Sequence, residues 1–246
     1  MTTLQLYHYE PSANSMKPLL CLAEKGLEYE SHYVDLHNFE QHSEPFVALN
    51  PNGQVPVLVH DGAVITESTV INEYLDEVFP EVRLVPRDPV ARARMRIWSK
   101  FVDEYFCPAL SRIGWSVLIP KIAARLQSGE LEEALKKVPL EEQRRKWLTA
   151  ATESFTKEEL ADSHRQVCVS IERMEGILRD AKWLAGDDYS LADVNTYSMV
   201  AGTARLIPEA MPEEKTPNAV AWLQRMNERP AVKAALATSR LAGQGG

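Results

Sequence analysis

The stretch Tyr7-His8-Tyr9-Glu10-Pro11-Ser12-Ala13-Asn14-Ser15-Met16-Lys17 joins an alternating segment to an apolar segment with helical spacing. Residues 4–9 predict a strand, and a helix is expected from about residue 14 or 15 to Gly26. The polar residues between them are good helix N-caps, and a helix start gathers unpaired backbone N–H groups with partial positive charge. A hydroxyl at this point either caps the helix only or also holds an anion, such as a thiolate.

Working outward from this stretch, residues 1–80 predict a small α/β domain with the element order β-α-β-α-β-β-α. Four strands are expected at about 4–9, 29–35, 55–60 and 63–66, and Asp61-Gly62 has the composition of a hairpin turn. Three helices are expected at about 15–25, 40–48 and 67–79, of which the last stops at Pro80.

The remainder of the chain predicts helices only. Asp88-Pro89 supplies an N-cap followed by proline at the first helical position, and the helical pattern continues past Pro108. Short amphipathic helices are expected in the polar segment 121–160, and a long helix at about 157–180. The predicted architecture is an α/β domain at 1–80, a linker at 81–88, an all-helical domain at 89–240 and a disordered tail at 241–246.

The composition is that of an ordinary globular protein, with 45% hydrophobic and 25% charged residues among 246. The three cysteines, Cys21, Cys107 and Cys168, are widely spaced and odd in number, which favours reduced thiols over a disulfide scaffold. The N-terminus lacks the basic start and apolar run of a secretion signal. No uninterrupted apolar stretch approaches the roughly 20 residues of a bilayer-spanning helix. We therefore expect a cytoplasmic protein without a membrane segment.

The net charge of -8 argues against general nucleic-acid binding. Residues 1–80 hold 2 Lys/Arg against 12 Asp/Glu, so the negative charge is concentrated in the predicted α/β domain. An acidic domain that binds an anion must do so through local backbone dipoles. No metal site is expected, because His32, His37 and His42 are spaced by five residues and share no helix face.

Three motifs go beyond a generic α/β domain. Gln54-Val55-Pro56-Val57-Leu58 places a proline at the start of a strand, Glu67-Ser68-Thr69-Val70-Ile71 opens the third predicted helix, and Ser190-Leu191-Ala192-Asp193 forms a capping box. Together they resemble the glutathione transferase superfamily, whose members have a thioredoxin-like first domain and an all-helical second domain. The resemblance covers nearly the whole chain and implies glutathione as co-substrate and a homodimer.

Further motifs are similar to those of the bacterial lignin β-etherases, glutathione-dependent enzymes that cleave β-aryl ethers, in their branch of fungal-type architecture. These motifs are residues 13–18, 39–43, 66–71 and 102–107 together with Ile113-Gly114-Trp115. The resemblance implies displacement at the carbon next to a ketone: glutathione thiolate attacks, a phenolate leaves, and a thioether forms with inversion. That step requires no metal and no general acid.

The glutathione transferase resemblance also assigns residues that bind glutathione. The peptide bond before Pro56 is cis in the family, and the backbone of Val55 pairs with the cysteinyl part of glutathione like a short added strand. Ser68 and the N–H groups at its helix start are expected to bind the γ-glutamyl carboxylate, and Glu67 to reach toward the amine.

Two glutamines and one aspartate complete the expected glutathione site. Gln41 and Gln54 are placed to meet the glycine end of glutathione, although plain surface polarity explains Gln41 equally well. Asp103, on the long helix that faces the first domain, is a further candidate to support the ligand's amine.

The reacting sulfur is expected to belong to glutathione, because the chain has no cysteine where thioredoxins and glutaredoxins carry theirs. A free thiol has a pKa near 8.5, and lowering it by about two units requires roughly 2.7 kcal/mol of preferential stabilisation. One hydroxyl hydrogen bond plus a helix N-terminus supplies energy of that size. Ser15 is the first candidate donor, Asn14 the second and Ser12 the third; Tyr7 and Tyr9 are rivals, because other transferase classes use a tyrosine hydroxyl.

An aromatic substrate needs an apolar wall, for which Tyr9, Phe106, Ile113 and Trp115 are candidates. Phe106 and Trp115 are alternatively part of the core of the helical domain. The competing functions are a glutathione transferase acting on another electrophile, such as a dehalogenase or isomerase, and a non-catalytic interaction module with the same fold. Retention of a full set of ligand-binding motifs argues against the module.

Overall fold

A four-stranded sheet forms the centre of the first half of the chain. The computed structural model describes residues 3–126, 129–153 and 155–241. Strands β1 (Leu4–His8), β2 (Glu30–Tyr33), β3 (Val57–His60) and β4 (Ala63–Thr66) lie in the order β2-β1-β3-β4. β1 is parallel to β2 and antiparallel to β3, and β3 is antiparallel to β4 across the predicted turn at Asp61-Gly62.

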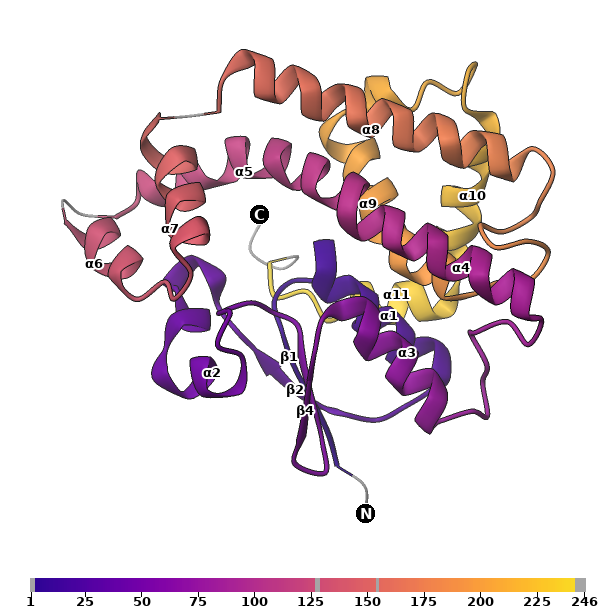
Figure 1. Ribbon diagram of the computed structural model, residues 1–246, viewed down its shortest axis with the longest axis horizontal. Helices are drawn as coiled ribbons and strands as arrows, with labels where there is room; N and C mark the ends of the chain where they lie inside the picture. Colours follow the sequence, from indigo (N-terminus) through magenta and orange to yellow (C-terminus); the bar gives the residue numbers. More distant parts are fainter. Residues whose placement is uncertain (1–2, 127–128, 154, 242–246) are drawn as a thin grey trace.

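The two faces of the sheet are covered by different helices (Figure 1). Leu6 and Leu58 are fully buried in a core shared with helices α1 (Ala13–Lys25) and α3 (Ser68–Val78). Their neighbours Tyr7 and Val57 face the other way, as strand alternation requires, and pack with Phe46 of helix α2 (Glu44–Leu49). The sheet is thus a central layer between helices.

The segment predicted as one helix at 40–48 is a helix only in its second half. It is preceded by two 3₁₀ turns, η1 (Leu36–Asn38) and η2 (Glu40–His42). Phe39 separates the two turns with φ 59°, and Ser43 separates η2 from α2 with an extended backbone, φ -71° and ψ 150°, which interrupts the predicted helix. Pro45 lies in the first turn of α2, where its missing N–H has no helical acceptor to lose.

The second half of the described chain is helical, as the sequence predicts. A long rod made of α4 (Pro89–Phe101), the π turn η3 (Val102–Phe106) and α5 (Cys107–Ala123) runs across the molecule, with α8 (Lys157–Leu178) above it (Figure 1). The remaining elements are α6 (Glu130–Lys136), α7 (Glu141–Leu148), η4 (Thr149–Glu153), α9 (Leu191–Leu206), η5 (Pro208–Ala210), α10 (Pro217–Glu228) and α11 (Pro230–Leu236).

A wider turn lets the long rod pass Pro108 without breaking. Proline has no N–H to donate and its ring crowds the preceding helical turn. At η3 the backbone N–H of Cys107 bonds to the carbonyl of Val102, five residues back instead of four. This turn lies directly above the start of α1, and π turns of this kind often mark functional sites.

One core joins the two halves of the chain. Helix α9 is buried over its first ten residues and packs against α1 and α4. A chain of buried polar groups runs with it: Asn72 of α3 donates to Asn195 of α9 (2.8 Å), which donates to Ser99 of α4 (3.0 Å). Buried amides paired in this way fix the relative position of three helices.

A second, smaller core lies where the helical half meets the segment before α2. Phe39 packs on Trp147 of α7, with ring centroids 4.9 Å apart. Around this contact lie buried apolar residues of α5, α6, α7 and η4: Ile119, Ile122, Leu135 and Ala150. The polar segment expected to form short amphipathic helices therefore packs over the N-terminal half.

The end of the described chain returns to the sheet. The backbone N–H of Arg240 donates to Glu10 (3.1 Å), and the Arg240 guanidinium lies 4.3 Å from the centre of the Tyr33 ring. A disordered tail is predicted from residue 241, and residues 242–246 lie outside the described residues. No helix in the described part of the chain is both long and apolar enough to cross a bilayer.

Candidate active site

The residues predicted to bind glutathione converge at one edge of the sheet. Tyr7 lies opposite Val57, and Val57 opposite Thr66, in the strand register. Continuing that register brings the end of β1, the start of β3 and the end of β4 to a common edge, with Val55 between the β1 and β4 chains. Helices α1 and α3 both begin here, so two helix N-termini meet at the same place.

Ser15 sits in this cluster with its hydroxyl oriented. The side chain is only 4% exposed, and its Oγ accepts a hydrogen bond from the backbone N–H of Tyr9 at 3.2 Å. A hydroxyl has one proton to donate in addition to its acceptor lone pairs. No acceptor for that proton lies among the described residues, so Ser15 is free to donate to a ligand.

The two rival residues at the start of α1 are placed differently. Ser12 occupies the N-cap position, but its side chain makes no capping hydrogen bond. Asn14 Oδ1 lies 3.7 Å from the Cys107 sulfur, which ties it to η3 and α5. In the described part of the chain, the backbone N–H groups of Asn14 and Ser15 also lack an acceptor. The first turn of α1 therefore offers one hydroxyl and two amides to an anion.

The two tyrosines on β1 and beyond it point to different places. Tyr7 stacks on His32, with centroids 4.4 Å apart, on the face of the sheet away from α1. The Tyr9 hydroxyl is 3.0 Å from His37 Nε2, and burial raises the pKa of Tyr9 to about 12. Tyr7 is thus remote from the start of α1, whereas Tyr9 lies beside it through the bond to Ser15.

The segment before β3 presents free backbone to the site. The peptide bond between Val55 and Pro56 is cis, as the family resemblance predicted. Within the described residues, neither the N–H nor the C=O of Val55 has a partner, which is the arrangement needed to pair with an extended peptide. Gln54 is exposed next to it, and its own carbonyl accepts a hydrogen bond from Asn50 (2.8 Å).

The start of α3 adds a second set of donors. Glu67 is the N-cap and has φ 66°, an uncommon left-handed conformation for a residue with a side chain. Its carboxylate is exposed, while the Ser68 side chain is 7% exposed and has no hydrogen-bond partner among the described residues. This geometry leaves a hydroxyl and the first amides of α3 available to a carboxylate.

A buried ion pair lies beneath the site. The sequence pointed to one of its members, Asp103, but not to the other, Lys17. The Lys17 ammonium of α1 is fully buried and lies 2.5 Å from Asp103 of η3. The other oxygen of Asp103 accepts a hydrogen bond from the Thr69 hydroxyl of α3 (2.7 Å). Asp103 thus links the two helix starts to the helical half, with one carboxylate oxygen paired with Lys17 and the other with Thr69. The only sequence signal for Lys17 is a charge inside an otherwise apolar helical stretch.

Gln41 and His42 lie in η2 at the rim of the site. Gln41 is 4% exposed, and its Oε1 has no partner in the described part of the chain. Both ring nitrogens of His42 are likewise buried without a partner, and burial lowers the pKa of this ring to about 4. An unsatisfied buried amide oxygen is costly, and a ligand donor at Gln41 would satisfy it. The glutathione contact of Gln41 stays a prediction.

Of the four candidates for the substrate wall, three are partly exposed and one is buried. Phe106 is fully buried in the main core, which matches the alternative of a core role. Ile113 and Trp115 of α5 are half-buried, and the Trp115 ring lies 5.1 Å from that of Trp147. Their position on α5 leaves them, together with Tyr9, as the partly exposed apolar candidates.

A large hollow opens beside Tyr9. Its volume is about 760 Å³, and it lies between the segment before α2, the end of α5 and the returning chain end. His37, the hydrogen-bonding partner of Tyr9, lines it, as do Arg125, just after α5, and Arg240. A cavity of this size suits a small organic substrate. In the part of the chain that the structure describes, no three His, Cys, Asp or Glu side chains are grouped as metal ligands would be.

Comparison with known families agrees with this geometry. Residues 2–77 match the model of the glutathione S-transferase N-terminal domain, and residues 106–230 match that of the glutathione S-transferase C-terminal domain. The chain belongs to the glutathione S-transferase family.

Its similarity extends to individual members of that family. The chain is 48% identical over 237 residues to protein LigF of Sphingobium sp. (strain NBRC 103272 / SYK-6), which covers 94% of this chain and 92% of LigF. The crystal structure of beta-etherase LigF from strain SYK-6 matches with a TM-score of 0.92 over 96% of this chain and 100% of that one. Glutathione S-transferase 3 of Zea mays is 28% identical over 239 residues, covering 96% and 95% of the two chains.

Proposed function

We propose that this protein is a β-etherase that uses glutathione to cleave the β-aryl ether bond of lignin-derived α-keto aryl ethers. The observation that carries the proposal is the match to LigF over nearly the full length of both chains, at 48% identity and a TM-score of 0.92. More general transferases are more distant, with 28% identity for the Zea mays enzyme. The maleylacetoacetate isomerase of Mus musculus is 31% identical over 211 residues, also well below LigF. The dehalogenase, isomerase and non-catalytic alternatives therefore have less support.

Glutathione binds along the sheet edge in this proposal. The free N–H and C=O of Val55 pair with the cysteinyl residue, next to Pro56. The γ-glutamyl carboxylate meets Ser68 and the first amides of α3, and Glu67 reaches its ammonium group. Gln41 and Gln54 meet the glycine end, which gives the buried Gln41 amide a partner.

This arrangement delivers the cysteinyl sulfur to the start of α1. Ser15 donates its free proton to the thiolate, and the unpaired amides of the first turn add the positive end of the helix dipole. About two pKa units of depression require roughly 2.7 kcal/mol, which one hydrogen bond to a charged group and the helix terminus supply together. Asn14 is the second candidate donor, although its Oδ1 faces Cys107.

The reaction is a single displacement. The thiolate sulfur forms a bond to the carbon next to the ketone, the bond from that carbon to the aryl ether oxygen breaks, and both electrons leave on the oxygen. The products are a glutathione thioether and a phenolate, which takes a proton from water after release. The adjacent carbonyl activates the carbon. The protein must therefore chiefly position the two reactants, exclude water from them and ionise the glutathione thiol. Tyr9, Ile113 and Trp115 hold the aromatic rings.

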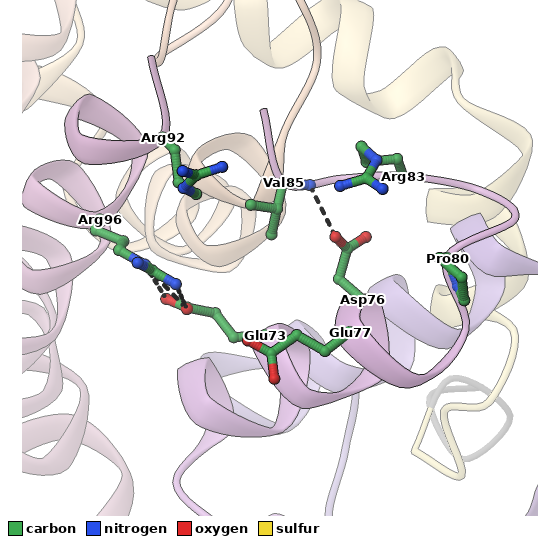
Figure 2. Close-up of a pocket in the computed structure, with 8 residues that line it drawn as sticks. All are labelled: Glu73, Asp76, Glu77, Pro80, Arg83, Val85, Arg92 and Arg96. Atoms are coloured by element: carbon green, nitrogen blue, oxygen red, sulfur yellow. Dashed lines mark hydrogen bonds and ion pairs between the residues drawn. The ribbon is translucent and has the colours of Figure 1, made fainter. Parts of the chain in front are cut away.

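The homodimer is also part of the proposal. Among the most exposed large apolar side chains are Val70 of α3, 55% exposed, and Ile97 of α4, 60% exposed. Between the same helices is a hollow of about 310 Å³, where Arg96 pairs with Glu73 at 2.7 Å (Figure 2). Apolar side chains beside mixed charges suit a twofold interface, in which one patch meets its own copy.

A location in the cytoplasm is proposed from the cysteines. Cys21, Cys107 and Cys168 are all free thiols in the structure. Burial raises the pKa of Cys21 and Cys107, so these two favour the unreactive protonated form. Free thiols persist in a reducing compartment.

The decisive experiment measures phenol release from a fluorogenic α-keto β-aryl ether. The protein with glutathione is expected to release the phenol and to form the glutathione thioether in equal amounts, as detected by mass spectrometry. S-Methylglutathione, which binds through the same groups but has no thiol, serves as the matched control and should give no release. Release without glutathione, or no release with it, would contradict the proposal.

A further inference from the structure

The polar segment 121–160, which the sequence predicts as short amphipathic helices, contains a half-buried cation. Lys146 of α7 is half-buried, and its ammonium nitrogen lies 4.4 Å from the centre of the Trp115 ring of α5. In the described residues, no carboxylate pairs with this ammonium and no acceptor takes a hydrogen bond from it. Its neighbour Arg145 is exposed, as an ordinary surface cation is.

The position of Lys146 relates it to the candidate active site. The charged and polar groups that act on it are Cys107 and Arg112, both on α5, and Glu142, four residues earlier on α7. The Cys107 sulfur in turn lies 3.7 Å from Asn14, in the first turn of α1. Lys146 thus lies on the wall formed by α5 and α7, which Figure 1 shows above the sheet edge on the side opposite α3. The same wall carries Trp115, a candidate contact of the aromatic substrate.

Lys146 is a half-buried residue whose ammonium makes no ion pair among the described residues, and the Glu142 carboxylate on the same helix acts on it only from beyond ion-pair distance. Removing a charge from water costs energy that a nearby carboxylate or phosphate normally offsets. Here burial lowers the pKa of Lys146, and the Trp115 ring face provides partial compensation. Such a cation is best explained by an anion that is present only at some stage of the catalytic cycle.

The proposed reaction produces such an anion. Negative charge starts on the glutathione sulfur, at the first turn of α1, and ends on the ether oxygen of the leaving aryl group. That oxygen is displaced on the side of the carbon opposite the sulfur, which is away from α1 and toward the substrate wall. A cation fixed there stabilises the transition state more than the neutral ether, as catalysis requires.

We propose that the Lys146 ammonium, held on the face of Trp115, stabilises the phenolate that leaves during ether cleavage; this inference rests on the proposed function. The sulfur–carbon bond forms as the carbon–oxygen bond breaks, and the electron pair on the oxygen faces the ammonium. Lys146 transfers no proton in this step, and the phenolate is protonated by water after release. The same pairing selects for substrates whose leaving group carries charge on an aryl oxygen.

The test compares Lys146→Gln with two matched controls. Lys146→Arg keeps the cation, and Arg145→Gln removes an exposed cation from the same helix. Three substrates share one ketone and differ in their leaving group: an unsubstituted phenoxide, a nitrophenoxide and a bromide. Because nitrophenoxide and bromide are better leaving groups, they depend less on external stabilisation.

The expected result is a graded loss. Lys146→Gln lowers kcat for the phenoxide about 100-fold, the low end of the roughly 100- to 1,000-fold loss on removal of one oxyanion-stabilising donor. The loss is smaller for the nitrophenoxide and absent for the bromide, and KM for glutathione does not change. Lys146→Arg and Arg145→Gln stay within a few-fold of the wild-type enzyme for all three substrates.

Several results would overturn the inference. An equal loss for phenoxide and bromide would indicate a structural role, and a rise in KM for glutathione alone would assign Lys146 to the tripeptide. Should Lys146→Gln fail to fold, Lys146→Met, which keeps the apolar stem against Trp115, must show the same graded loss. A wild-type enzyme that conjugates the bromide but releases no phenol would contradict the proposed function itself, before any variant is compared.

Discussion

Asp103→Asn is expected to destabilise the folded protein because it leaves a buried charge without its partner. Lys17 is fully buried, its ammonium lies 2.5 Å from Asp103, and no second carboxylate pairs with it among the described residues. Breaking a buried pair by removing one partner costs about 3–5 kcal/mol. The Asp103 side chain is 36% exposed, so water compensates in part, and we expect about 2–3 kcal/mol.

The assay is a urea titration followed by circular dichroism, with the midpoint converted to a free energy of unfolding. Lys100→Gln is the matched control, because Lys100 and Glu104 form a pair of exposed side chains and its loss should cost about 0.5 kcal/mol or less. The double variant Lys17→Met with Asp103→Leu removes both charges and should recover most of the stability that Asp103→Asn loses. A stability of Asp103→Asn within 0.5 kcal/mol of wild type, at roughly the precision of the method, would refute this account of the pair.

Three other perturbations test separate parts of the structure. Gly53→Ala should lower the free energy of unfolding by about 1–3 kcal/mol and weaken glutathione binding, because the residue has φ 60° and an added Cβ would lie 2.5 Å from His42. Gly62→Ala is the control, because Gly62 also has a positive φ, 85°, but an added Cβ there meets open space. Equal losses of stability in the two variants would contradict this. Burial lowers the pKa of His42 from 6.5 to about 4, so its neutral ring contributes fully to stability above pH 6.5, and about 3 kcal/mol of that stability is lost as the pH falls to 4. His42→Gln should make the free energy of unfolding less dependent on pH between 6.5 and 4. An unchanged pH dependence would be evidence against the buried neutral ring. Ile97→Asp combined with Val70→Asp should convert a dimer to a monomer on a sizing column, whereas a wild-type monomer would remove the proposed interface.

Much of the fold was predictable because its signals are local. Gly26 ends α1 in a left-handed conformation, with φ 64°, as glycine after an apolar helix predicts. Asp61-Gly62 joins β3 to β4 as expected for such a pair, and the capping box at Ser190 starts α9. These features depend on a few neighbouring residues, which a single sequence contains.

Features that depend on distant residues were not predictable in the same way. The predicted helix at 40–48 is interrupted at Ser43 and begins as a separate turn after the left-handed Phe39, whose ring packs on Trp147 of the helical half. The sequence indicates no partner for Lys17 or Lys146, because only the fold brings Asp103 and Trp115 next to them. Phe106 is an aromatic residue of the kind that lines apolar pockets, but its position in η3 places its side chain entirely in the core. In each case the environment of the residue depends on partners that lie far away in the sequence.

The residues of the candidate site also fall into two groups, those that short motifs predict and those that only the fold identifies. Val55, Pro56, Glu67 and Ser68 could be assigned because the short motifs that contain them resemble those of the glutathione transferases. Among the described residues, the Val55 backbone and the Ser68 hydroxyl have no hydrogen-bond partner. Choosing among Ser12, Asn14 and Ser15 required coordinates, because only the fold shows that the Tyr9 amide orients the Ser15 hydroxyl. Their roles in binding and catalysis remain predictions.

The most direct test of the central claim is a pH titration of the glutathione thiol bound to the protein, followed by the ultraviolet absorbance of the thiolate. We predict that the bound thiol titrates about two units below the value of about 8.5 for a free thiol, and that Ser15→Ala returns it most of the way without abolishing binding. A bound thiol that titrates like free glutathione, or a depressed pKa that is unchanged in Ser15→Ala, Asn14→Ala and their double variant, would contradict the claim that the start of α1 ionises the sulfur through these side chains.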